Sequence, residues 1–237
     1  MAKRIPEPSI SVRTPHYEIS DQTAMTKARR LMKQLKEYAG VKTFEQNFVA
    51  MGFKPDLSPT RRWHAVLKMP IVRDDLFGAW YDKKGQIMAR PDPKKTDSVQ
   101  LWFLASNTPP VGASDDSWTA LNLMMVALRR REILNPQTAI NQLGTVIPLV
   151  QVTLHALQRM IQRGFVLTER EEISFSQLLE CLVQVWAFAD DRYHEEGVLP
   201  AEYKIQHGGA IFVIKAKENY YSGEVSMTLI TMYPKKP

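Results

Sequence analysis

The chain has 237 residues and a mass of 27.2 kDa, with 44% hydrophobic residues, which suits one large domain or two modest ones and argues against gross disorder. Lysine and arginine total 31 against 25 acidic residues, and the formal charge of +6 favours polyanionic partners such as nucleic acid. The single cysteine, Cys181, excludes an intrachain disulfide and a thiolate cluster for structural zinc.

The sequence carries no signal that points to a membrane. No apolar run reaches the roughly 18 residues that a bilayer span needs, and the segment MAKRIPEPSISVRTPHY lacks the apolar stretch of a signal peptide. We therefore expect a cytoplasmic protein with no membrane partner. Cys181 stands between apolar residues of a predicted helix, so we expect it to pack in the core rather than to act as a nucleophile.

The amino-terminal half reads as an extended arm, then helices, then strands. Three prolines predict an extended arm over 1–20, and Asp21 is expected to cap a helix over 22–38. A short helix is predicted over 43–51. Alternating and β-branched segments predict strands over 62–69, 76–81, 86–89 and 99–105, with a turn at 82–85.

The carboxyl-terminal half begins after the breaker SNTPPVGASDD. Helices are predicted over 117–133, 154–163 and 174–187, with Thr153 as a cap and Gly164 as a stop for the second of them. Extended segments are predicted over 146–152, 211–217 and 224–233, with a turn near 219–223.

These elements predict an α+β fold in two parts. We expect amino-terminal helices with a small antiparallel sheet, and carboxyl-terminal helices packed on a short antiparallel sheet. The corresponding division is an arm at 1–20, an α/β region at 21–112 and an α+β domain at 113–237.

The window TLHALQRMIQRG, residues 153–164, carries the most informative group of polar side chains. His155, Arg159 and Arg163 are four residues apart and share one side of the predicted helix. Guanidiniums grip phosphate, and an imidazole moves protons near neutral pH, which together suit cleavage of RNA through the 2′-hydroxyl without metal or cofactor. The alternative is that these side chains form the solvated face of an amphipathic helix.

The pattern His-Ala-x-x-Arg-Met-x-x-Arg-Gly, followed by a second helix and a terminal hairpin that ends Thr-x-Tyr, resembles the toxin-like RNase domains related to RelE in the barnase/EndoU/colicin/RelE group. The resemblance covers about 149–233, and the segments LTEREE and ADDRYHEEGVLPAEYKIQ interrupt it. It implies a small α+β domain with a basic RNA-binding cleft. By position it implies the catalytic residues His155, Arg159, Thr231 and Tyr233, with Arg163 binding phosphate.

Further candidate substrate-binding residues lie outside this window. His207 opens a His-Gly-Gly turn, and it is either an exposed turn residue or, within roughly 10 Å of His155, its partner in acid and base chemistry. Arg61 and Arg62 belong to a basic and aromatic cluster that is either a phosphate-contacting surface or ordinary solvated surface. His194 stands in an acidic run that we interpret as solvated rather than as a metal site.

The motifs for nucleotide hydrolysis, dinucleotide redox chemistry, zincin proteolysis and elbow-type hydrolases are missing. We therefore predict a nucleic-acid-interacting protein, with metal-independent toxin-type RNase activity as one hypothesis. The other is a non-enzymatic phage, plasmid or defence-system protein that docks on nucleic acid or on an acidic protein. The expected partners are RNA or another polyanion, and an acidic inhibitor protein.

Overall fold

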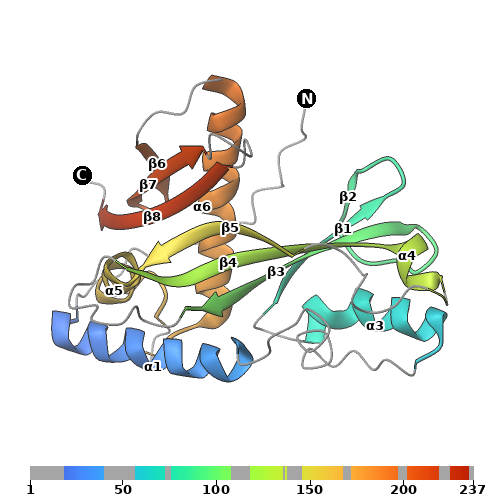
Figure 1. Ribbon diagram of the computed structural model, residues 1–237, viewed down its shortest axis with the longest axis horizontal. Helices are drawn as coiled ribbons and strands as arrows, with labels where there is room; N and C mark the ends of the chain where they lie inside the picture. Colours follow the sequence, from blue (N-terminus) through green and yellow to red (C-terminus); the bar gives the residue numbers. More distant parts are fainter. Residues whose placement is uncertain are drawn as a thin grey trace. The chain divides into compact units, whose positions relative to one another are not determined.

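The computed structural model describes residues 19–39, 57–72, 76–107, 118–135, 137, 146–167, 172–196, 202–218 and 225–234 (Figure 1). Its helices are α1 (Asp21–Ala39), α3 (Pro59–Val72), α4 (Arg130–Leu134), α5 (Leu154–Gln162) and α6 (Phe175–Glu196). Its strands are β1 (Phe77–Asp82), β2 (Ile87–Met88), β3 (Thr96–Ser106), β4 (Thr119–Arg129), β5 (Val146–Thr153), β6 (Tyr203–His207), β7 (Ala210–Glu218) and β8 (Val225–Pro234). The predicted helix at 43–51 and turn at 219–223 lie outside the described residues.

The described strands form one eight-stranded sheet in the order β2-β1-β3-β4-β5-β8-β7-β6. The pair β5–β8 is parallel, whereas β1–β2, β1–β3, β6–β7 and β7–β8 are antiparallel. The predicted fold class, with a small antiparallel sheet in each half, is therefore wrong. Strand pairing between distant parts of the chain joins what local sequence patterns present as two small sheets.

The chain divides into two compact units, whose limits fall inside α1, β3, β4 and β5. The first unit holds α3, β1, β2 and α4, and the second holds α5, α6, β6, β7, β8 and most of α1 and β5. The three-segment division at 20/21 and 112/113 stays a prediction.

In the first unit, helix α3 takes the place of the strand predicted over 62–69. Trp63, Val66 and Leu67 are buried and lie on one side of a helix, a spacing that a strand would divide between two faces. Pro59 opens the helix, where a proline costs no hydrogen bond. Trp80 Nε1 donates to the Leu67 carbonyl at 3.2 Å, and Gly78 of β1 has no room for a Cβ because Pro70 lies within 2.2 Å of that position.

The helix predicted over 117–133 is mostly strand β4, and only its end is the short helix α4. The helical interpretation used Leu121, Met124 and Leu128, which also fit an apolar strand. The structure buries residues on both faces of β4, because β4 lies inside the sheet between β3 and β5: Ala120, Leu121, Leu123, Val126 and Leu128.

In the second unit, the helices predicted over 22–38 and 154–163 are confirmed as α1 and α5, and the extended segments as β5, β7 and β8. The helix predicted over 174–187 is longer than expected, because α6 continues to Glu196 and includes the acidic run around His194. Strand β6 was not predicted. Arg192 of α6 donates to the Lys204 carbonyl of β6 at 3.4 Å.

Cys181 is buried in α6, as predicted. Burial, with a smaller contribution from the Glu180 charge, raises the pKa of its thiol to about 12. The thiolate is therefore scarcely populated at neutral pH, and the side chain serves packing.

Candidate functional site

The candidate residues of α5 are fixed to the sheet by Thr153, which ends β5 and caps α5. Its hydroxyl accepts a hydrogen bond from the Ala156 N–H at 3.1 Å and donates to the Ile230 carbonyl of β8 at 3.2 Å. Thr153 is 5% exposed, so both bonds are shielded from water. Figure 1 shows the carboxyl-terminal half of β8 beside α5, in agreement with this contact.

Strand β8 carries a bulge at the same place. Val213 pairs with Thr231 and Ile214 pairs with Leu229, which leaves Ile230 without a paired residue on β7. The extra residue allows Leu229 and Met232 both to be buried. Sequence alternation alone would place these two side chains on opposite faces, because they are three residues apart.

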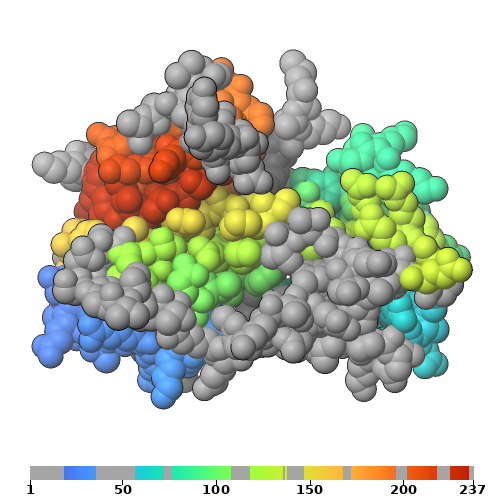
Figure 2. All heavy atoms as spheres, in the orientation of Figure 1, coloured from blue at the N-terminus to red at the C-terminus, as the bar shows by residue number. Residues whose placement is uncertain are grey.

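The bulge also places Thr231 and Tyr233 on a surface that we call the polar face. Residues paired across antiparallel strands share a face of the sheet. The register therefore assigns the following described side chains to the polar face: Lys204, Gln206, Lys215, Lys217, Ser226, Thr228, Thr231 and Tyr233. Figure 2 shows the atoms of β6, β7 and β8 as a continuous red surface beside the yellow atoms of β5 and α5.

Positive charge on the polar face comes from Lys204, Lys215 and Lys217, all of which are exposed. Glu202 lies 3.8 Å from the Lys215 ammonium, an exposed pair that water screens strongly. Val213 is on the same face but is buried. Tyr233 is half-buried, with Ile211 as its cross-strand partner.

A polar contact that the sequence did not suggest extends this face onto β5 and β4. Gln151 Oε1 accepts hydrogen bonds from the hydroxyls of Thr228, at 3.5 Å, and Thr119, at 3.4 Å. Gln151 and Thr228 are paired in the parallel register of β5 and β8. No sequence pattern predicts this contact, because Thr119, Gln151 and Thr228 are distant from one another in the sequence.

His207 lies on the opposite face of the sheet, which we call the core face and which carries the buried side chains of β6, β7 and β8. Its ring centroid is 6.2 Å from that of Phe188 on α6 and 6.4 Å from that of Phe212 on β7. Gly208 and Gly209 both have positive φ, 56° and 77°, as a two-residue hairpin turn requires. The structure therefore separates His207 from Thr231 and Tyr233 by the thickness of the sheet.

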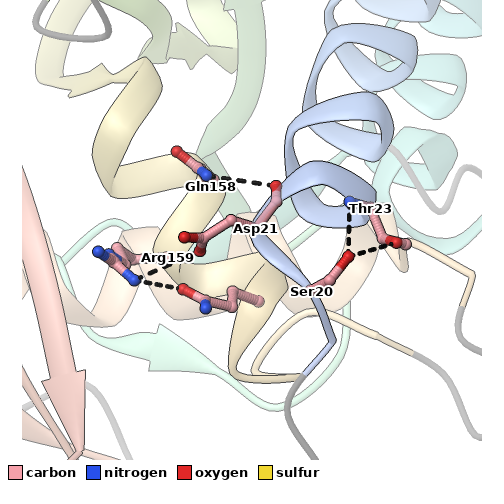
Figure 3. Close-up of polar contacts among 6 residues, drawn as sticks. Ser20, Asp21, Thr23, Gln158 and Arg159 are labelled. Carbon is pink, nitrogen blue, oxygen red and sulfur yellow. Dashed lines mark hydrogen bonds and ion pairs between the residues drawn. The ribbon is translucent and has the colours of Figure 1, made fainter.

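Arg159 makes contacts that the sequence did not indicate (Figure 3). Its Nη1 donates to Gln162 Oε1 at 2.5 Å and lies 3.6 Å from Asp21 Oδ1 on α1. Gln158 Nε2 donates to the Asp21 backbone carbonyl at 3.3 Å. Asp21 was expected to cap α1, but the cap is Ser20, whose hydroxyl accepts from the Thr23 N–H at 3.2 Å.

The other predicted site residues are placed as follows. His155 is half-buried in the first turn of α5, and Arg163 is the half-buried residue that ends this helix. Arg61 and Arg62 belong to the first unit, where Arg61 is exposed and Arg62 Nε donates to the Leu57 carbonyl at 2.8 Å. The structure thus joins α5 to the strand of Thr231 and Tyr233, and it does not bring His207 to that surface.

The described residues carry neither a metal-binding cluster nor a membrane-spanning helix. Within those ranges, no group of three or more histidine, cysteine, aspartate or glutamate side chains is arranged to hold a metal ion. His194 Nδ1 lies 2.8 Å from the Asp190 carbonyl and 3.7 Å from the Asp190 carboxylate, and its ring lies against the Tyr193 ring, all within α6. None of the helices in the described part of the chain is long and apolar enough to span a bilayer.

Comparison with known proteins identifies no relative: no family model, no curated protein and no solved structure matches the chain.

Replacement of Thr153 by valine should destabilise the second unit. The change keeps the shape of the side chain but removes the helix cap and the bond to Ile230, and we expect a loss of about 2 kcal/mol in the free energy of unfolding. Urea unfolding measures this loss. Thr153→Ser retains the hydroxyl and serves as the control, and equal stability of the serine and valine variants would contradict the assignment.

Acid should destabilise the protein through His207. Burial lowers the pKa of His207 from its ordinary value of 6.5, so below that pH the unfolded chain binds a proton that the folded chain resists. We expect the free energy of unfolding of the wild type to fall, relative to His207→Phe, as the pH drops below about 6.5. Chemical unfolding at several pH values gives both curves, and parallel curves would refute a lowered pKa of the half-buried His207 imidazole.

Proposed function

We propose that this protein binds RNA, or a similar single-stranded nucleic acid, on the polar face. The observation that carries the proposal is the placement of Lys204, Lys215 and Lys217 on one face with Tyr233. Lys215 and Lys217 can attract successive phosphates, and Tyr233, which pairs with Ile211 toward the other end of the face, offers a ring on which a base can stack. The overall charge of +6 acts in the same direction.

The hydroxyl and amide groups of the polar face support the same function. Ser226, Thr228, Thr231 and Gln206 lie among the lysines and offer hydrogen bonds to sugars, phosphates and base edges. A sheet surface of this kind reaches bases only when they are not enclosed in a duplex, which favours single strands.

The α5 helix, which carries His155 and Arg159, begins beside β8, because Thr153 ties its start to the Ile230 carbonyl. Cleavage of the bound RNA is a second candidate function, which rests on this junction and on the resemblance of the α5 motif to RelE-related RNases. In that hypothesis His155 transfers the proton, Arg159 and Arg163 hold the phosphate, and Thr231 or Tyr233 orients the substrate.

The binding proposal is tested by neutralising the three lysines. We expect Lys204→Gln/Lys215→Gln/Lys217→Gln to bind a labelled single-stranded RNA at least ten-fold more weakly in fluorescence anisotropy, because three phosphate contacts are lost. The slope of log affinity against log salt should become shallower by about 2. The control is Lys83→Gln/Lys84→Gln/Lys94→Gln, which makes the same charge change at exposed positions of the first unit. If both triple variants lose affinity equally, the polar face is not the binding surface.

The cleavage hypothesis is tested with the same RNA in the presence of a chelator. His155→Ala should lower the rate of cleavage by about 10²-fold or more while leaving RNA affinity within a few-fold of the wild type. His64→Ala, a change at an exposed histidine of α3, is the matched control. Absence of cleavage products from the wild type, with binding intact, would establish the non-enzymatic alternative.

A further inference from the structure

Asp21 places a negative charge beside Arg159, a candidate phosphate-binding residue. Its carboxylate lies 3.6 Å from Arg159 Nη1, although α1 and α5 are far apart in the sequence. Figure 3 shows the Asp21 side chain pointing toward the Arg159 guanidinium. The carboxylate thus stands where a phosphate oxygen would bind this arginine.

The pair is arranged so that the anion can be exchanged. Its separation of 3.6 Å exceeds a good charged hydrogen bond, and the Asp21 and Arg159 side chains are 65% and 32% exposed. An exposed pair of this kind contributes little stability. A backbone phosphodiester carries the same single charge as a carboxylate and can also bind a guanidinium bidentately. A strand can therefore replace the carboxylate when its other phosphates find further cations.

Other bonds keep the two helices together without the carboxylate. The Asp21 backbone carbonyl accepts from Gln158 Nε2 at 3.3 Å, and the Ile19 N–H donates to the Gln162 carbonyl at 3.0 Å. The Gln162 side chain holds Arg159 Nη1 at 2.5 Å. The Asp21 side chain can therefore rotate away while the backbone contact and the position of the guanidinium persist.

We infer that Asp21 is an internal competitor for an anion site at Arg159, and that nucleic acid binds there by displacing the Asp21 carboxylate with a phosphate. The inference rests on the proposed function and adds regulation to the same surface. Asp21 lowers the affinity for every phosphate, so RNA must supply enough further contacts on the polar face to take its place. The competition thus selects extended polyanions over small phosphate-bearing molecules.

The test is the neutral variant Asp21→Asn, which keeps the backbone carbonyl that Gln158 contacts. We expect it to bind the labelled RNA about three-fold more tightly than the wild type, the change expected for removing one partly exposed competing charge. Asp191→Asn is the control, because it removes an exposed carboxylate of α6 in the same unit. In an Arg159→Gln background, Asp21→Asn should give no gain.

A second probe separates failure of this inference from failure of the proposed function. Calorimetric titration with inorganic pyrophosphate should detect tighter binding by Asp21→Asn than by the wild type, and this gain should vanish with Arg159→Gln. That result without RNA binding would overturn the proposed function and leave the anion site standing. RNA binding unchanged by Asp21→Asn, or a gain equal to that of Asp191→Asn, would overturn the competition and leave the proposed function standing.

Discussion

The hydroxyl of Thr153 joins the three elements on which the candidate site depends. It lies at the point where β5 becomes α5, and through Ile230 it reaches the irregular part of β8. One buried hydroxyl thus contacts both the first turn of α5 and the residue of β8 at the bulge. A shift of one residue in the β8 register would move Thr231 and Tyr233 to the core face and expose Leu229.

The bulge keeps the apolar side chains of β8 on one face of the sheet and its polar side chains on the other. Met227, Leu229 and Met232 bury apolar area on one face, and the polar residues that alternate with them remain on the other. Thus the same strand supplies both the apolar core of the second unit and the hydroxyl groups of the proposed binding surface. His207 belongs to the apolar side of this division, since aromatic rings surround it and its charged form is disfavoured there.

The sequence predicts α1, α5, β5, β7 and β8, because their signals are local. The Thr153 cap, the Gly164 stop and the alternation in β7 and β8 are all read within a few residues. The strand β4 was mistaken for a helix because Leu121, Met124, Met125 and Leu128 recur at helical spacing, whereas the segment is apolar on both faces of a strand that lies inside the sheet. The Asp21–Arg159 pair and the grouping of Gln151 with Thr119 and Thr228 depend on contacts between distant segments, which no local pattern reports.

The position of β8 in the strand order has a consequence for synthesis on the ribosome. β8 is the latest of the described strands to be translated, yet it lies between β5 and β7 and pairs with both. Until residues 225–234 leave the exit tunnel, β5 and the β6–β7 hairpin each have an unsatisfied edge. Nascent chains of this protein therefore expose two unpaired strand edges that β8 covers in the complete sheet. Such edges favour aggregation, and chaperones that bind incompletely folded sheets would protect them.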